Sequence, residues 1–402
     1  MPSTATQSFD FRPVHAPLSA PQPRLGVAVR TVVRALQAMQ KEALVASSES
    51  GCVWRLVSDE GPYLAGSDLA PPPLGVFVTG LVSANANALL ALASERGIRL
   101  ANLRLTQDTF YSMEGSALRG TMTGGARSPS LHVEAACDLT DAELGSLAVD
   151  AVATSPPAGL IAGVHESLFA LIHNGARTAT GRVGELVADA PEDPQRLFEA
   201  MRVQREPDEP LMHRAAEVEP TEGEGGVMSS LRPEQSRTLH ARAVCTIRPD
   251  GTKQIDQYLF KPRGSQFRML SDERGRAPDA LSYLAAGIAL CFMTQLGRYA
   301  SITRQKLDRY RALQDMHLSG NGGPAAPIET HVFLDTPGDA DAARKMLDMG
   351  EQTCFLHALC RTPLEQEVTA RSAAGSPRSL STDGEDSQSP GSPASIAAGG
   401  PR

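Results

Sequence analysis

The stretch Trp54-Arg55-Leu56-Val57-Ser58-Asp59-Glu60 returns later in the chain as Phe267-Arg268-Met269-Leu270-Ser271-Asp272-Glu273. Each copy is followed by an apolar segment that starts at a proline, Pro71 in the first copy and Pro278 in the second. Repetition at about half the chain length indicates two homologous modules rather than one large domain.

The two copies differ at a thiol. Nine residues after each proline the chain has a glycine, Gly80 or Gly287, and four residues further on it has Ala84 or Cys291. One module therefore keeps a thiol where the other has a methyl group.

Length and charge narrow the class of protein. A chain of 402 residues with 41% hydrophobic residues is long enough for two domains with real cores. Its net charge of -8 and the lack of a basic stripe argue against a nucleic-acid partner, because neutralising phosphates requires a basic face.

The cysteines indicate catalytic or regulatory chemistry. Six cysteines are too few for a disulfide scaffold, and none form a CxxC metal pair. The N-terminal residues lack the apolar run of a signal peptide, and no window reaches the roughly 18 apolar residues of a membrane span. We therefore expect a cytoplasmic protein with no membrane partner, in a compartment that keeps thiols reduced.

Composition divides the chain into five parts. Residues 1–23 and 371–402 are rich in Ser, Pro or Gly and are predicted to be disordered, and residues 204–235 read as an acidic linker. The structured modules are then residues 24–203 and 236–370.

The second module predicts an α+β fold. Alternation over residues 239–247 and 253–259, around the turn Arg248-Pro249-Asp250-Gly251, predicts a β-hairpin. Residues 278–300 are apolar on most faces, which is typical of a buried central helix. Two more strands, over residues 310–318 and 328–334, precede a helix over residues 339–359.

The first module repeats this order, with alternation over residues 131–137, a capping Thr140 and a helix over residues 141–153. The fold class is therefore α+β, with antiparallel sheets packed around central helices, twice over.

Two cysteines of the second module lie on its two helices. Cys291 and Cys354 are far apart in sequence and meet only if the fold brings the helices together. Small residues around Gly287 permit the close approach that a disulfide requires. From the residues alone, a redox pair and two buried free thiols both remain open.

The segment Ala285-Ala286-Gly287-Ile288-Ala289-Leu290-Cys291-Phe292, together with Cys354-Phe355-Leu356-His357 on a later helix, resembles the OsmC/Ohr family of organic-hydroperoxide peroxidases. The resemblance covers most of residues 236–370 and, more faintly, residues 25–200. It implies that Cys291 attacks the peroxide and that Cys354 resolves the product as a disulfide.

The resemblance also implies an arginine from the first hairpin turn and a carboxylate near the start of the helix. Arg248 occupies the turn position, and Asp279 follows the proline. Asp279 stands twelve residues before Cys291, about half a helical turn farther than the family pattern, so it reads equally as a charge at the helix N-terminus.

Further candidates surround Cys291 on its helix. Gln295 and Arg298 follow at i+4 and i+7 on the cysteine's face, and with Phe292 they are candidate substrate-binding residues; Gln295 and Arg298 are also candidates for an interface. Cys360 lies about 240° round the helix from Cys354, so no metal site is predicted there.

The first module lacks this chemistry. Ala84 takes the place of Cys291, Pro72 that of Asp279, and Thr154 or Ser155 that of Cys354. Family members are intertwined homodimers with active sites at the interface, so the resemblance implies an intrachain pseudo-dimer with one degenerate module. That module could lend Arg55 or Asn85 to the remaining site.

The expected function is a thiol-dependent peroxidase of organic hydroperoxides that acts in oxidative stress defence. Its partners are then the hydroperoxide and an external dithiol reductant, and no cofactor is implied. The alternative is a non-enzymatic OsmC-like protein for ligand binding or redox sensing. Oligomerisation beyond the pseudo-dimer stays open.

Overall fold

The computed structural model describes residues 9–217 and 236–373. The first eight residues, most of the expected linker and most of the expected tail lie outside the described residues. The helices are η1 (Pro62–Leu64), α1 (Pro73–Glu95), α2 (Asp141–Thr154), α3 (Ala158–Ala162), α4 (Gln195–Ala200), α5 (Ala280–Ile302), α6 (Ala340–Thr353) and α7 (Phe355–Cys360).

The strands are β1 (Arg12–His15), β2 (Gly26–Ala35), β3 (Lys41–Ser47), β4 (Val53–Ser58), β5 (Ala101–Glu114), β6 (Thr123–Ala136), β7 (Ser167–His173), β8 (Ala176–Thr178), β9 (Gly184–Glu185), β10 (Arg202–Val203), β11 (Met212–Ala216), β12 (Ser236–Ile247), β13 (Lys253–Lys261), β14 (Gln266–Ser271), β15 (Arg309–Ser319), β16 (Ile328–Asp335) and β17 (Glu367–Ala373). The predicted hairpin is confirmed as β12 and β13, and the predicted central helix as α5.

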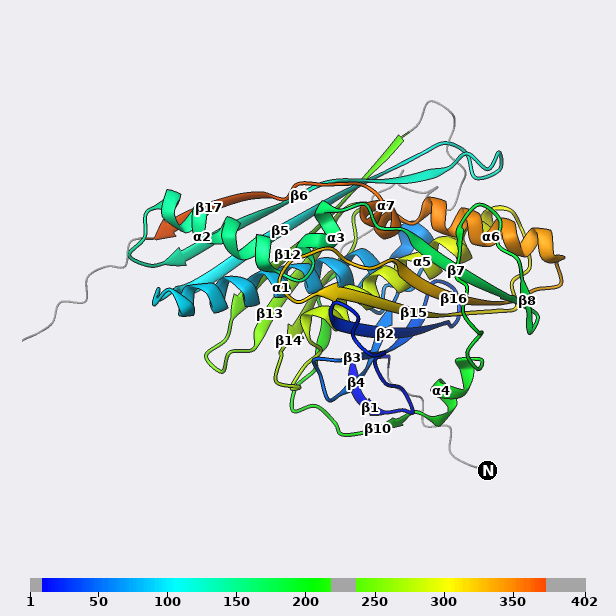
Figure 1. The fold of residues 1–402 in the computed structure, drawn as a ribbon, viewed down its shortest axis with the longest axis horizontal. Helices are drawn as coiled ribbons and strands as arrows, with labels where there is room; N and C mark the ends of the chain where they lie inside the picture. Colours follow the sequence, from blue (N-terminus) through cyan, green and yellow to red (C-terminus); the bar gives the residue numbers. More distant parts are fainter. Residues whose placement is uncertain (1–8, 218–235, 374–402) are drawn as a thin grey trace, which may run out of the picture.

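Two sheets enclose a pair of long helices. One sheet has the order β10-β1-β4-β3-β2-β15-β16-β7-β8, with β9 beside β7, and the other has the order β11-β14-β13-β12-β5-β6-β17. α5 packs on β2, β3 and β15 of the first sheet, while α1 packs on β5, β12 and β13 of the second. The two helices pack on each other in the middle of the molecule (Figure 1).

Both sheets combine strands from the two halves of the chain. β2 of the first half pairs with β15 of the second, and β12 of the second half pairs with β5 of the first. Residues 24–203 and 236–370 are therefore not separate packing units, although each carries one copy of the repeat. Most strand pairs are antiparallel as expected, but β16–β7, β17–β6 and β7–β9 are parallel.

The helix pair crosses at the two repeated glycines. A Cβ on Gly80 would stand 2.5 Å from the backbone nitrogen of Leu284, and a Cβ on Gly287 would stand 2.6 Å from Cβ of Phe77. Each helix thus presses its glycine against the same region of the other, and only a hydrogen fits there. The approach buries apolar faces of both helices, which supplies the main stabilisation of the centre.

Three segments differ from the sequence expectations. β1 lies within residues 1–23, where burial of Phe11 against Tyr283 offsets the cost of ordering the chain. β11 lies within residues 204–235, where it pairs with β14 and forms the edge of the second sheet. The helix expected over residues 339–359 breaks at Cys354, whose ψ of 120° is extended, so α6 and α7 are separate helices.

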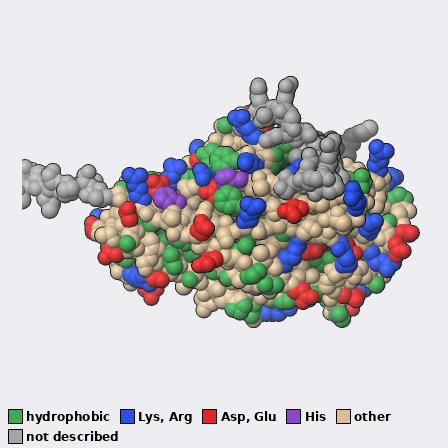
Figure 2. Space-filling model, turned by 90° about the horizontal axis from the view of Figure 1, so that it is seen from above, with side chains coloured by type: hydrophobic (Ala, Val, Ile, Leu, Met, Phe, Trp, Pro, Cys, Tyr) green, Lys and Arg blue, Asp and Glu red, His purple; other side chains and the backbone are tan. Residues whose placement is uncertain are grey.

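The surface and the long helices were tested for membrane character. α1 and α5 are long and apolar enough to cross a membrane by composition, yet 72% and 94% of their apolar windows are buried inside the protein, as in core helices. On the face seen in Figure 2, Lys and Arg side chains are interspersed with Asp and Glu rather than gathered by sign.

The glycine crossing predicts the outcome of a substitution pair. Gly287→Ala places a methyl group against Phe77, so we expect a loss of about 1–3 kcal/mol in the free energy of unfolding. The control is Gly145→Ala in α2, where the nearest atom is the Ala370 Cβ at 3.9 Å, and here Ala's better helix propensity should stabilise by up to about 1 kcal/mol. Urea unfolding measures both; equal stability of Gly287→Ala and the parent would contradict the close approach.

Candidate active site

The fold brings the two cysteines of the second half together. Cys291 lies in the middle of α5, and Cys354 lies at the break between α6 and α7, where α7 packs on α5 and each thiol shifts the pKa of the other. Both are buried, with 2% and 0% of their surface exposed. Neither Cys291 nor Cys354 is joined in a disulfide.

The pKa values of Cys291 and Cys354 shift in opposite directions. Burial raises the pKa of Cys291 well above its ordinary value, and the hydrogen bond and charge of Cys354 raise it further. Burial also acts to raise the pKa of Cys354, but the hydrogen bond from Cys291 and the contacts with His357 outweigh it and bring that pKa well below the ordinary value. The first proton lost from this pair therefore leaves its charge on Cys354.

A buried lysine from the first half of the chain faces the cysteines. Lys41 begins β3, is 0% exposed and donates from Nζ to the carbonyl of Met39 at 2.8 Å. Burial lowers the pKa of Lys41 to about 8, while the negative charges of Glu60, Asp59 and Cys291 act in the other direction. At neutral pH the ammonium is thus retained, within electrostatic reach of the Cys291 sulfur.

Glu60 is the carboxyl group of this site. Burial raises its pKa to about 7, and a hydrogen bond from Tyr63 at 2.6 Å and the charge of Lys41 act to lower it. Glu60 also acts electrostatically on Cys291 and on Arg298. Glu60 therefore interacts electrostatically with Lys41, with Arg298 and with the Cys291 thiol. It is the charged group common to the lysine end and the arginine end of the site.

Arg298 and Gln295 form the polar end of the site. Arg298 is buried and donates from Nη1 to Gln295 Oε1 at 3.2 Å, with the sulfur atoms of Met113 and Met122 at 3.0 and 3.5 Å. Burial and the nearby charge of Arg237 lower the pKa of Arg298 to about 10, which still leaves it charged at neutral pH.

Comparison with known protein families places this site in context. Residues 272–369 match the sequence model of the OsmC-like protein family. That segment of the chain belongs to the OsmC-like family. One solved structure, an OsmC-like hydroperoxide resistance protein from Jannaschia sp. CCS1, is similar at 23% sequence identity and a TM-score of 0.17, covering 26% of this chain and 75% of that chain. No curated protein matches the chain.

The OsmC-like segment contains only part of the site. Cys291, Cys354 and Arg298 lie inside residues 272–369, whereas Lys41 and Glu60 come from the first half of the chain. The cation and carboxyl group that face the sulfur are thus supplied from outside the segment that identifies the family.

Two of the residues predicted from the sequence lie elsewhere. Asp279 is the N-cap of α5, accepting from the Ser282 backbone N–H at 2.8 Å, and the rise of a helix places it about 18 Å from Cys291 along the axis. Burial and the charge of Glu273 raise its pKa to about 6. Arg248 is half-buried in the β12–β13 turn and pairs with Glu209 at 2.7 Å. Each side chain is held by another partner: Asp279 by the first turn of its own helix, and Arg248 by Glu209 from the segment that precedes β11.

The two residues that the first module was expected to contribute to the site make contacts elsewhere. Arg55 pairs with Glu42 and Asp10 in the sheet, and Asn85 donates to Gln107 at 3.0 Å. Lys41 and Glu60 were not singled out from the sequence. The signal was there, because Glu60 ends the repeated Ser-Asp-Glu and Lys41 corresponds to Lys253 at the start of each hairpin's second strand.

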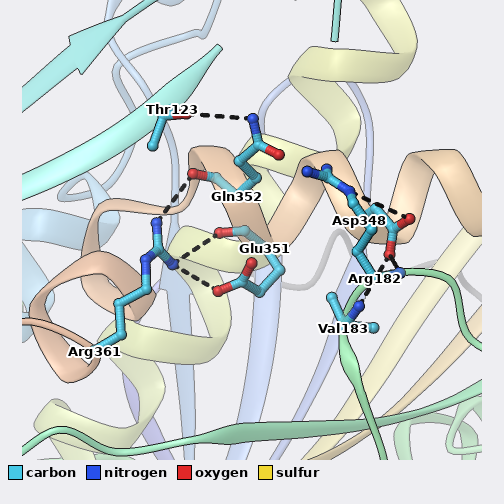
Figure 3. Close-up of a pocket in the computed structure, with 7 residues that line it drawn as sticks. All are labelled: Thr123, Arg182, Val183, Asp348, Glu351, Gln352 and Arg361. Atoms are coloured by element: carbon cyan, nitrogen blue, oxygen red, sulfur yellow. Dashed lines mark hydrogen bonds and ion pairs between the residues drawn. The ribbon is translucent and has the colours of Figure 1, made fainter. Parts of the chain in front are cut away.

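A small polar pocket of about 290 Å³ lies beside the Cys354 segment, over α6 (Figure 3). Its charged side chains are paired with one another, Arg361 with Glu351 at 2.6 Å and Arg182 with Asp348 at 3.8 Å. Arg361 also donates to the carbonyl of Gln352 at 3.1 Å, at the end of α6. This wall of the pocket therefore fixes the helix break that presents Cys354.

Metal ligation was considered for the same region. Within residues 9–217 and 236–373, no three His, Cys, Asp or Glu side chains gather in a way that could hold a metal ion.

The buried Glu60 predicts a dependence of stability on pH. The folded protein keeps this proton up to about pH 7, whereas an unfolded glutamate loses it near 4.5, so the folded state binds more protons in that window and loses stability as pH rises through it. Relative to Glu60→Gln, we expect the parent to lose up to about 3 kcal/mol of unfolding free energy between these pH values.

Urea unfolding across this pH range measures the effect. Glu367→Gln, at an exposed glutamate, is the matched control and should follow the parent. A Glu60→Gln profile that runs parallel to that of the parent would show that Glu60 does not hold a proton in the folded state.

Proposed function

We propose that this protein is a thiol peroxidase that reduces organic hydroperoxides with the Cys291–Cys354 pair. The observation that carries the proposal is the packing of α5 on α7, which brings two buried thiols close enough to shift each other's pKa, within electrostatic reach of Lys41. A family that includes a hydroperoxide resistance protein supports the same class of reaction.

The first step is an attack by the Cys291 sulfur on the distal peroxide oxygen. Cys354 as thiolate takes the Cys291 proton, the S–O bond forms and the O–O bond breaks, leaving Cys291 as sulfenic acid and an alkoxide. The Lys41 ammonium gives a proton to the alkoxide, which leaves as the alcohol.

The second step forms the disulfide. The Cys354 sulfur attacks the sulfenic sulfur of Cys291, the S–O bond breaks, and the departing hydroxide takes up the Cys354 proton and leaves as water. An external dithiol then reduces the disulfide by thiol exchange and restores both thiols. The proposal needs no prosthetic group, and it fits a reducing compartment such as the cytoplasm.

Lys41 and Glu60 replace the arginine and carboxylate that Arg248 and Asp279 were expected to supply. A buried cation lowers the cost of the charge that develops on the attacked peroxide, since the site excludes water. The Glu60 carboxylate favours the charged form of Lys41 and also attracts the Arg298 guanidinium. Gln295, through its bond to Arg298, belongs to the same polar end of the site.

We also propose that the chain is an intrachain pseudo-dimer with one working site. The reciprocal contacts of Gly80 and Gly287, and the reciprocal pairing of strands between the halves, support this relation. In the counterpart of the site, Lys253 of the second half pairs with Glu273 at 3.5 Å, but Ala84 of the first half stands where the thiol would be.

The walls of the site favour an apolar substrate. Phe292 packs against Phe169 with ring centroids 5.4 Å apart, next to the cysteine it follows in sequence. Such walls suit an alkyl or aryl hydroperoxide better than hydrogen peroxide, because the organic group keeps favourable contacts on leaving water.

A redox sensor that reacts once without turnover is the second candidate. The observation in its favour is the burial of both sulfurs, which limits access by a reducing dithiol. Turnover with a dithiol after the first oxidation separates it from the peroxidase.

Counting thiols tests the proposed function directly. One equivalent of cumene hydroperoxide should lower the free thiols of the parent from six to four, because two are consumed in the disulfide. Cys291→Ser should lose none to a disulfide, and Cys52→Ser, at a partly exposed cysteine away from the pair, should still lose two. A parent that keeps all six thiols sinks the proposal.

The two related lysines provide a second test. Lys41→Met should slow the reaction of Cys291 with cumene hydroperoxide by at least about tenfold, because the alkoxide loses its cation. Lys253→Met removes the corresponding buried lysine, which pairs with Glu273, and should leave that rate unchanged. Stopped-flow measurement of peroxide loss distinguishes them, and equal rates in both variants would remove Lys41 from the mechanism.

A further inference from the structure

His357 is a buried polar residue that the reaction above leaves without a role. Its Nδ1 lies 3.1 Å from the sulfur of Cys354. The residue is 1% exposed. The resolving cysteine thus has an imidazole held directly against it.

Packing fixes the imidazole in this position. Its centroid lies 5.7 Å from the ring of Phe169 and 5.5 Å from the ring of Phe292, which meets it edge-on. Within residues 9–217 and 236–373, Nε2 has no hydrogen-bond partner. The sulfur of Cys354 is therefore the polar atom that the described residues present to this ring.

Packing alone does not explain an imidazole at this buried position. Burying a ring nitrogen without a partner costs free energy that a phenyl ring of similar size would not. The arrangement is explained if the other ring nitrogen is needed at Cys354.

The first half of the chain has neither the thiol nor the imidazole at the positions that correspond to Cys354 and His357. α2 corresponds to α6, with N-caps Thr140 and Asp339, so Ser155 corresponds to Cys354 and Ala158 to His357. The half that lacks the resolving thiol also lacks the imidazole, so the two groups occur as a unit.

We propose that His357 makes Cys354 the resolving nucleophile, by holding its sulfur as a thiolate aimed at Cys291 and by carrying its proton. This inference rests on the proposed peroxidase function. Once Cys291 is a sulfenic acid, the proton of the Cys354 thiol moves to Nδ1 of His357. The thiolate attacks the Cys291 sulfur, the S–S bond forms and the S–O bond breaks. The departing hydroxide takes the proton from the imidazolium and leaves as water, which returns His357 to its neutral form.

The role weighs more on the second step of the reaction than on the first. Loss of the imidazole leaves Lys41 and Cys291 in place, so the peroxide is still consumed, although more slowly, because Cys354 also takes up the Cys291 proton in the first step. The sulfenic acid then waits for a poorer nucleophile, since a buried thiol without a partner ionises weakly.

The test follows single turnover of the full-length protein with one equivalent of cumene hydroperoxide. His357→Phe replaces the imidazole by an apolar ring, and we expect disulfide formation at least about tenfold slower than in the parent. The Cys291 sulfenic acid should then persist long enough to be trapped by dimedone. His357→Gln keeps a side chain that can donate and should recover part of the lost rate. His331→Phe, at a buried histidine on β16, is the matched control and should behave as the parent.

A second readout needs no peroxide. In a Cys291→Ser background at neutral pH, the ultraviolet absorbance of the Cys354 thiolate should fall when His357 becomes Phe. If the parent consumes no peroxide, the proposed function fails; if the parent turns over but His357→Phe forms the disulfide at the parental rate, this inference is overturned. Unchanged thiolate absorbance in His357→Phe also overturns it.

Discussion

The structure depends on the contact of α1 with α5 at two glycines. Because Gly80 and Gly287 have no side chain, each helix can lie directly on the backbone of the other. That approach positions α5 against β3 and β4 of the first half, so Cys291 comes to face Lys41. A larger residue at the crossing would move α5 away from β3 and so separate Cys291 from Lys41. The site would then no longer combine residues from both halves of the chain.

The chemistry follows from burying several charged groups together. A lone ammonium or thiolate in a dry interior is costly, but a cation, a carboxyl group and a thiol pair can offset one another's charges. Lys41, Glu60 and Arg298 form such a group around Cys291, and the shifts in their pKa values record the balance between burial and attraction. The site is therefore poised between protonation states near neutral pH, as proton-transfer chemistry requires.

The sequence predicted those features that depend on local pattern. The hairpin of β12 and β13, the apolar helix α5 and the capped helix α2 were each predicted from alternation, apolar faces or a cap, and the cysteine pair from the family resemblance. Its failures concern contacts between distant parts of the chain. The arginine was sought in the turn of the same module, whereas the cation at Cys291 is Lys41 from the other half. The break at Cys354 was missed because Arg361 and the extended backbone set it, and neither leaves a periodic signal.

The central claim is that one asymmetric site, built by both halves of the chain, carries out the oxidation. Peptide mapping of the full-length protein after one equivalent of an organic hydroperoxide tests it most directly. The account predicts a Cys291–Cys354 disulfide in each chain, with Cys52, Cys137, Cys245 and Cys360 left as thiols. A disulfide that links any other pair, or stable oxidation confined to another cysteine, would contradict it.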